Sequence, residues 1–126
     1  MSKKGRVLVV DDDSGLCQLY KLTLEQEGYE VFTANQGEEG LSRAVKLKPE
    51  LILLDIMMPM IHGLNVLDIL KATPETKDIK IIVSSALSDD ETKNKAKEFG
   101  ASDYIVKSQA TMAEVIARIG GILEKK

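Results

Sequence analysis

Short apolar runs alternate along the chain with segments in which apolar residues recur every three or four positions. Two runs, Val7–Val10 and Leu51–Leu54, are wholly aliphatic, and a third, Ile79–Val83, is nearly so. Such runs are typical of strands that are covered on both faces. The stretches Glu30–Thr33 and Asp103–Val106 are less purely apolar. We therefore expect these two to be the edge strands of the same sheet.

The remaining segments show the 3.6-residue period of amphipathic helices, whose apolar stripes face a core. Gly28 and Gly100 stand where the first and the fourth helix are expected to end. The stripe positions are, in chain order, Leu16, Leu19, Tyr20 and Leu24; Leu41, Ala44 and Val45; Val66, Leu67 and Leu70; Ala96 and Phe99; and Met112, Val115, Ile116, Ile119 and Leu123.

The resulting order, βαβαβαβαβα, predicts an α/β fold with a doubly wound, five-stranded parallel sheet. The crossovers between strands should be right-handed. The chain has 126 residues, and domains most often contain about 100–150, so we expect a single domain over residues 1–126. Ligands of such sheets bind beyond the carboxyl ends of the strands, which is where candidate chemistry should be sought.

Polar side chains stand at these carboxyl ends. The first expected strand leads into Asp11 and Asp12, the third into Asp55, the fourth into Ser84 and Ser85, and the fifth into Lys107. An acid that ends a buried strand is unfavourable without a partner, and carboxylates held close together favour a bound cation. Mg²⁺ takes one or two protein carboxylates and leaves room for phosphate oxygens. We therefore expect a Mg²⁺ site on this rim, which Mn²⁺ could also fill.

The same residues fit phosphoryl transfer. A carboxylate such as Asp55 can act as a nucleophile, and the transferring group needs positioning and cations more than covalent help. Mg²⁺ would supply one cation and Lys107 the other, while Ser85 could donate a hydrogen bond to a phosphoryl oxygen. The set is chemically complete for making an acyl phosphate, and it contains no obvious strong base to activate a substrate hydroxyl.

Taken singly, several polar residues have simpler explanations. Asp13 is expected to cap the following helix, and Lys107 alone could be a solvated lysine. His62, the only histidine, is expected to be a solvated loop residue. Cys17 is expected to be a small packing residue. Only the coincidence of acids, hydroxyl and amine at four strand ends points to a site.

Composition narrows the partners. The chain has 17 Lys and Arg against 20 Asp and Glu, a net charge of −3, which argues against direct nucleic-acid binding. No apolar run approaches the roughly 20 residues of a membrane helix, and the first run is too short for a signal peptide. With a single cysteine, the chain can form no internal disulfide. We expect a cytoplasmic protein that does not bind membranes.

Four motifs in order resemble the receiver domain of bacterial two-component response regulators, from about Arg6 to the last helix. They are Val10-Asp11-Asp12; Leu53-Leu54-Asp55-Ile56-Met57-Met58-Pro59 with Gly63; Ser85-Ala86; and Asp103-Tyr104-Ile105-Val106-Lys107. The intervals between the motifs are also similar to those of receivers. The resemblance implies a flavodoxin-like (βα)5 fold with strand order 2-1-3-4-5.

The resemblance also implies roles for individual residues. Asp55 would be the phosphoacceptor, and Ser85 and Lys107 would contact the phosphoryl group. Tyr104 would be the aromatic switch residue, turning inward as Ser85 moves toward the phosphate. The surface of the fourth helix, fifth strand and fifth helix would then report the state. The implied Mg²⁺ ligands are Asp11, Asp12, Asp55 and the backbone carbonyl of Met57.

The leading hypothesis is thus a signalling switch that catalyses only its own phosphorylation and dephosphorylation. Its partners would be a sensor histidine kinase or phosphotransfer protein, and a downstream effector protein or a missing output domain. It would be a monomer or a phosphorylation-dependent dimer. One alternative is a Mg²⁺-dependent phosphatase with an aspartyl nucleophile, although such enzymes usually carry a second acid where Met57 stands. Another is a nucleotide- or flavin-binding module, although no glycine-rich phosphate loop follows the first strand.

Two features set this sequence apart from the receiver pattern. Receivers usually place a proline after the lysine, joined by a cis peptide, whereas Ser108 follows Lys107 here; we expect this bond to be trans. Met57 and Leu87 occupy positions that tune dephosphorylation in the family, and both are apolar. We hypothesise that they slow attack by water. The chain ends at Glu124-Lys125-Lys126, so we expect either a stand-alone receiver or one excised from a longer protein.

Overall fold

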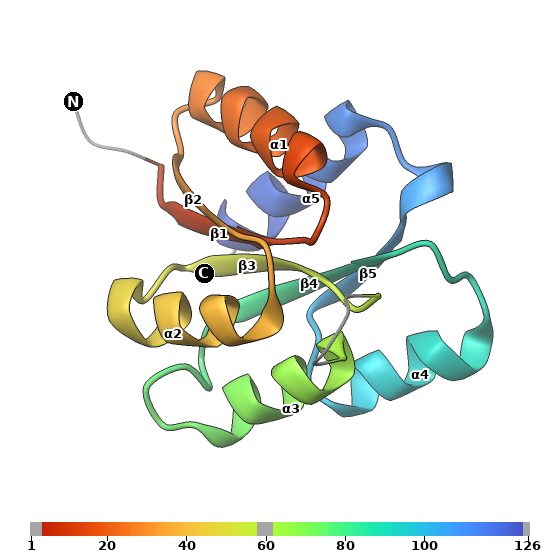
Figure 1. The fold of residues 1–126 in the computed structure, drawn as a ribbon. Coiled ribbons are helices and arrows are strands. Elements are labelled where there is room, and N and C mark those ends of the chain that lie inside the picture. Colours follow the sequence, from red (N-terminus) through yellow and green to blue (C-terminus); the bar gives the residue numbers. More distant parts are fainter. Residues whose placement is uncertain (1–3, 58–61, 125–126) are drawn as a thin grey trace.

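The computed structural model describes residues 4–57 and 62–124, in which five strands alternate with five α-helices (Figure 1). Met58 and Pro59 of the third-strand motif lie outside the described residues. The elements are β1 (Arg6–Val10), α1 (Ser14–Gln26), β2 (Glu30–Ala34), α2 (Gly37–Leu47), β3 (Leu51–Asp55), α3 (Gly63–Ala72), β4 (Lys80–Ser85), α4 (Asp90–Glu98), β5 (Asp103–Val106), a short 3-10 helix (Lys107–Gln109) and α5 (Met112–Glu124).

The strands form one parallel sheet in the order β2-β1-β3-β4-β5. The predicted doubly wound fold and its strand order are therefore confirmed, and β2 and β5 are the edge strands, as expected. β4 begins at Lys80 and ends at Ser85, among the serines expected at its carboxyl end. β2 runs one residue further than expected, to Ala34. Because all five strands are parallel, their carboxyl ends meet at one edge of the sheet.

Helices cover both faces of this sheet: α1 and α5 lie on one face, and α2, α3 and α4 on the other (Figure 1). Side chains of successive strand residues point to opposite faces, so each strand contributes to two separate cores. The buried residues of the α1/α5 face are Val7, Val9, Cys17, Tyr20, Leu24, Tyr29, Val31, Leu51, Leu53, Ile82, Ile105, Val115 and Ile119.

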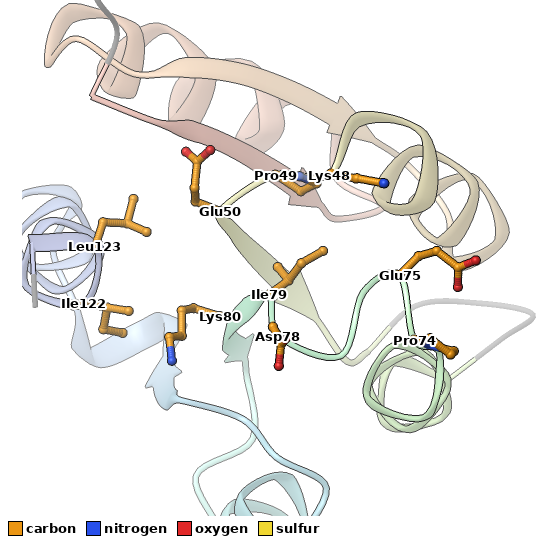
Figure 2. A pocket seen from close by; sticks show the side chains of 10 residues that line it. All are labelled: Lys48, Pro49, Glu50, Pro74, Glu75, Asp78, Ile79, Lys80, Ile122 and Leu123. Carbon is orange, nitrogen blue, oxygen red and sulfur yellow. The ribbon is translucent and has the colours of Figure 1, made fainter. Parts of the chain in front are cut away.

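An open groove lies at the amino ends of β3 and β4, the opposite edge of the sheet from the strand-end acids (Figure 2). Its lining mixes charged side chains with two apolar residues from the last turn of α5. It is formed by Lys48, Pro49, Glu50, Pro74, Glu75, Asp78, Ile79, Lys80, Ile122 and Leu123.

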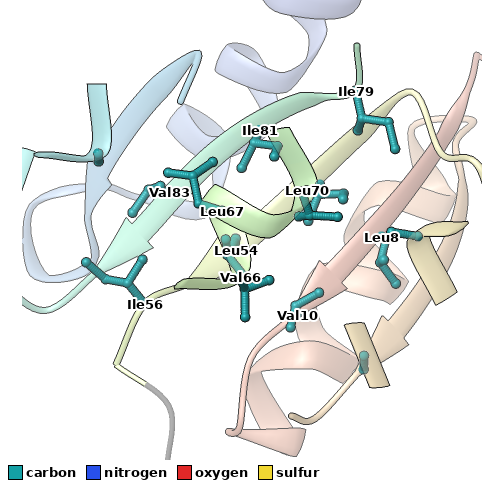
Figure 3. Close-up of a cluster of buried hydrophobic side chains, with 14 residues drawn as sticks. Leu8, Val10, Leu54, Ile56, Val66, Leu67, Leu70, Ile79, Ile81 and Val83 are labelled. Carbon is teal, nitrogen blue, oxygen red and sulfur yellow. The ribbon is translucent and has the colours of Figure 1, made fainter. Parts of the chain in front are cut away.

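The core of the α2/α3/α4 face is almost entirely aliphatic (Figure 3). The two cores explain the continuous apolar runs of β1, β3 and β4, because alternate residues of each strand fill one core or the other. None of the helices in the described part of the chain is long and apolar enough to cross a membrane. The buried members of this core are Leu8, Val10, Ala34, Ala44, Ile52, Leu54, Ile56, Val66, Leu67, Leu70, Ile79, Ile81, Val83 and Ala96.

Three of the predicted stripe positions are exposed. Leu19 is 50% exposed, Val45 44% and Phe99 36%, so counting them among the core-facing residues is wrong. In α1 the buried stripe is Cys17, Tyr20 and Leu24, which fixes the orientation of the helix and leaves Leu19 on its outer side. The prediction that Cys17 is a packing residue is confirmed.

The helix ends follow the predicted signals. The Asp13 carboxylate accepts a hydrogen bond from the Leu16 N–H at 3.0 Å, which confirms it as the cap of α1. Gly28 and Gly100 follow the ends of α1 and α4 with φ angles of +100° and +101°. This left-handed region strains residues that carry a Cβ, so glycine is required at both ends.

Two helical glycines differ sharply in what surrounds them, which gives a test of the packing. A Cβ on Gly63 would lie 2.2 Å from the Ile56 Cα, whereas nothing lies within 4 Å of one on Gly121. We expect Gly121→Ala to raise the free energy of unfolding by about 0.5–1 kcal/mol, and Gly63→Ala to lower it by about 1–3 kcal/mol. Urea unfolding of both variants measures the two changes, and a stabilising Gly63→Ala would contradict the packing described here.

Candidate functional site

The carboxyl edge of the sheet brings polar side chains from four strands together on the α1/α5 face. Asp11 follows β1, Asp55 ends β3, Ser84 lies near the end of β4, and Lys107 follows β5. The strand residues two positions before each of them pack in the core of that same face. The alternation of side chains thus selects this face for the acids and for the lysine.

Three acids form a cluster at this edge. Asp11 and Asp55 are buried, with exposed fractions of 2% and 3%, whereas Asp12 is exposed. One carboxylate oxygen from each lies within 4.8 Å of the other two. Oxygen donors converging from three carboxylates form the kind of ligand set that hard divalent cations take. The residues therefore fit a Mg²⁺ ion.

Lys107 is the counterion of the two buried acids. Its Nζ lies 2.7 Å from Asp11 Oδ2 and 3.4 Å from Asp55 Oδ2. Burial lowers the pKa of Lys107, but the hydrogen bond and the charge of Asp11, together with the charge of Asp55, outweigh burial and leave the pKa raised. The side chain is therefore a fixed positive charge within the site at neutral pH.

The environment of Asp55 opposes its ionisation. Burial raises the pKa of its carboxyl group and the nearby Asp11 raises it further, while the Met57 N–H and Lys107 act in the opposite direction. The Met57 N–H donates to Asp55 Oδ1 at 3.0 Å. This leaves Asp55 as a buried acid whose charge one lysine does not fully balance, so a further cation would stabilise it.

Asp11 is held by a network that the sequence did not reveal. The Asp13 N–H donates to Asp11 Oδ1 at 3.0 Å. The Asp11 carbonyl accepts from the Asn35 amide at 3.2 Å and from the Cys17 thiol at 3.3 Å. Burial raises the pKa of Cys17 to about 11, so the thiol keeps the proton that it donates. Asn35 lies beyond β2 and carries no strand-end pattern that would have singled it out.

Ser85 and Tyr104 lie on the other side of the sheet, on the α2/α3/α4 face. Ser85 Oγ accepts a hydrogen bond from the Leu87 N–H at 3.0 Å. The Tyr104 hydroxyl donates to the Leu87 carbonyl at 2.8 Å. Both predicted switch residues are thus tied to one backbone unit, although Ser85 follows directly after the residue that pairs with Asp55 across the sheet.

The remaining candidates lie at the rim. Met57 is 48% exposed, two residues beyond Asp55. His62 caps α3, its Nδ1 accepting a hydrogen bond from the Leu64 N–H at 3.1 Å, so it has a structural role that sequence reasoning missed. No cis peptide occurs among the described residues. The bond between Lys107 and Ser108 is therefore trans, as expected.

A five-stranded, doubly wound sheet in this order, with acids and a lysine at its carboxyl edge, defines the class of receiver-like α/β proteins. The model of the response regulator receiver domain matches residues 7–119. The chain belongs to this family, the receiver domains of two-component signalling.

Curated relatives agree with this assignment. The chain is 35% identical over 120 residues to the DNA-binding dual master transcriptional regulator RpaA of Synechocystis, which covers 95% of this chain and 49% of the relative. It is 38% identical over 125 residues to the alkaline phosphatase synthesis transcriptional regulatory protein PhoP of Bacillus subtilis, covering 99% and 50%. The chain thus spans about half the length of these relatives.

Solved structures agree as well. A CheY-like response regulator receiver domain protein from Methanospirillum hungatei superimposes with a TM-score of 0.89 and 29% identity, over 98% of this chain and 95% of that one. The BeF3-activated DrrB receiver domain superimposes with a TM-score of 0.86 and 30% identity, over 99% and 100%. The similarity covers whole receiver domains.

The electrostatics of Asp55 predict a pH-dependent effect of Asp55→Asn on stability without metal. Because the pKa of Asp55 is raised in the folded state, its ionised form destabilises the fold. This penalty is complete above the raised pKa and disappears as the pH falls below the ordinary value of 3.8. We expect Asp55→Asn to unfold at higher urea than wild type at pH 7 in chelator, with the gain shrinking in acid.

The control for this experiment is Asp68→Asn, which removes an exposed acid from α3. It should change the urea midpoint little at either pH. A gain for Asp55→Asn that stayed constant down to pH 3 would contradict the raised pKa.

Proposed function

We propose that this chain is a phosphorylation-controlled switch that accepts a phosphoryl group on Asp55 from a sensor histidine kinase or a phosphotransfer protein, with Mg²⁺ as cofactor. The observation that carries the proposal is the convergence of oxygens from Asp11, Asp12 and Asp55 within 4.8 Å, with the Lys107 Nζ 3.4 Å from Asp55. In this proposal the nucleophilic carboxylate of Asp55 would lie between two positive charges, the Lys107 ammonium and the bound metal.

The residues divide the work of transfer among them. An oxygen of Asp55 forms the new bond to phosphorus while the bond from phosphorus to the donor's histidine nitrogen breaks, and that nitrogen keeps the electron pair. Lys107 balances charge on the phosphoryl oxygens. Asp11, Asp12, Asp55 and the backbone carbonyl of Met57 would hold Mg²⁺, which when bound neutralises further charge on the same oxygens.

The conformational output follows from the links to Leu87. The Ser85 hydroxyl, whose oxygen accepts from the Leu87 N–H, would donate its own proton to a phosphoryl oxygen on Asp55. Movement of Ser85 toward that oxygen would shift the backbone of Leu87, which also holds Tyr104. The change would appear on the surface of α4, β5 and α5. Its reader would be an effector protein or an output domain outside this chain, and phosphorylation-dependent dimerisation is a further mode of output.

The proposal has a defined scope. Residues 1–126 would act as one receiver domain that modifies only itself and turns over no external metabolite. The cytoplasm is the proposed setting, because cytosolic kinases would supply the phosphoryl group. The relatives named above are transcriptional regulators. With a net charge of −3, this chain is proposed to influence such outputs through a partner and not by contacting DNA itself.

Incubation with acetyl phosphate and Mg²⁺ tests the proposal directly. We expect intact mass measurement to show one added phosphoryl group on wild type, labile in base as an acyl phosphate. Asp55→Asn should gain none, and chelation of the metal should block the reaction. The matched control, Asp68→Asn, should label like wild type. Equal labelling of Asp55→Asn would place the acceptor elsewhere and overturn the proposal.

The lifetime of the phosphorylated form tests the role of Met57. Its apolar, half-exposed side chain beside Asp55 offers no hydrogen bond to orient an attacking water. An amide there would supply one, so we expect Met57→Asn to lose its phosphoryl group several-fold faster than wild type, whereas Met57→Leu should match wild type. Phosphate release after removal of acetyl phosphate measures the rates, and equal decay of all three proteins would refute a role for Met57.

A further inference from the structure

The Lys107 side chain crosses a neighbouring strand to reach its partners. Lys107 follows β5, whereas Asp11 and Asp55 belong to the ends of β1 and β3, and β4 lies between β5 and β3. The 2.7 and 3.4 Å contacts of its ammonium therefore require the lysine to pass over the end of β4 on the α1/α5 face. What β4 presents there determines where the ammonium can rest.

Ser84 is the last residue of β4 that points to this face. It pairs with Asp55 on one side and with Ile105 on the other, and it is 1% exposed. Its Oγ makes no hydrogen bond with any atom of residues 4–57 and 62–124. A buried hydroxyl without a partner costs about 1–3 kcal/mol. We therefore expect this hydroxyl, which lies beneath the lysine side chain, to gain a hydrogen-bond partner in another state of the site.

Tyr20 of α1 brings a second hydroxyl to the same place. Its ring is buried in the α1/α5 core, with 5% of the residue exposed. Burial raises the pKa of the Tyr20 phenol, and the neighbouring Ser84 hydroxyl and Lys107 ammonium oppose that rise. The Tyr20 and Ser84 hydroxyls, from separate elements, therefore lie near each other and near Lys107, without the geometry of a hydrogen bond between them.

Binding of Mg²⁺, the proposed cofactor, would require the Lys107 ammonium to take another position. The carboxylate of Asp11 is bonded to the Lys107 ammonium and is also one of the three acids that can hold a metal. An ammonium and a divalent cation repel strongly when they share one carboxylate in a buried site. Occupation of the acid cluster by Mg²⁺ therefore favours departure of the ammonium from Asp11.

We propose that the hydroxyls of Ser84 and Tyr20 form a second resting place for the Lys107 ammonium, which it occupies when Mg²⁺ holds Asp11. This inference rests on the proposed function. In the second position the ammonium donates hydrogen bonds to Ser84 Oγ and to the phenolic oxygen of Tyr20. From there it can still reach a phosphoryl oxygen on Asp55, and its displacement from the acids becomes less unfavourable. Ser84 and Tyr20 are thus positioning residues that act through Lys107.

Titration calorimetry of the whole chain with Mg²⁺ tests this inference. Loss of one hydrogen bond to a charged group should weaken Mg²⁺ binding by roughly 10- to 100-fold in Ser84→Ala and in Tyr20→Phe. Lys107→Met keeps the length of the side chain and removes the charge, so it should bind Mg²⁺ more tightly than wild type. Adding Ser84→Ala or Tyr20→Phe to Lys107→Met should then leave the affinity unchanged.

The controls separate positioning from packing. Ser84→Thr keeps the hydroxyl and should bind Mg²⁺ as wild type does. Urea unfolding in chelator establishes that each variant is folded. Two outcomes would overturn the second resting place. One is that Ser84→Ala and Tyr20→Phe weaken Mg²⁺ binding as much in Lys107→Met as in wild type. The other is that neither substitution changes Mg²⁺ binding when Lys107 is present. Absence of Mg²⁺ binding by wild type would instead refute the proposed function, and this inference with it.

Discussion

The ion pair between Lys107 and Asp11 is the interaction on which the site depends. Two buried carboxylates and an exposed third meet at one edge of the sheet, and in a poorly polarisable surrounding their repulsion would be large. The lysine resolves this in the protein without metal by lying 2.7 Å from Asp11 and 3.4 Å from Asp55. It can do so only because parallel strands bring the end of β5 to the same edge as β1 and β3.

Much of the fold was predictable because strong local signals agreed with the tertiary structure. The runs Val7–Val10 and Leu51–Leu54 need apolar neighbours on both faces of the sheet, and the two layers of helices provide them. Leu19 and Val45 were misjudged because each stands next in sequence to a buried stripe residue, Tyr20 and Ala44, and the apolar stripe of a helix is broad. Cys17 was expected to pack, and with Tyr20 and Leu24 it forms the buried stripe of α1.

The site was predictable as a set of residues but not as a network. Strand ends located Asp11, Asp55 and Lys107, since the topology forces those ends together. Their pairing depends on how far a lysine reaches across β4, which no spacing encodes. Asn35 escaped notice for another reason, because an amide after an edge strand looks like an ordinary surface residue until its neighbours are known. Ser84 was placed at the strand end but was given no role, because its neighbours Tyr20 and Lys107 come from other elements.

The charged residues of the site and the residues proposed to respond to phosphorylation lie on opposite faces of the sheet. Asp11, Asp55 and Lys107 lie on the α1/α5 face, whereas Ser85 and Tyr104 lie on the α2/α3/α4 face, joined through Leu87. Adjacent residues of one strand point to opposite faces. In the proposed function, cations would balance a group on Asp55 on one face while Ser85 responds on the other. Under the proposed function, a change of charge would shift the outer surface without moving the acids of the cluster, as a reversible switch requires.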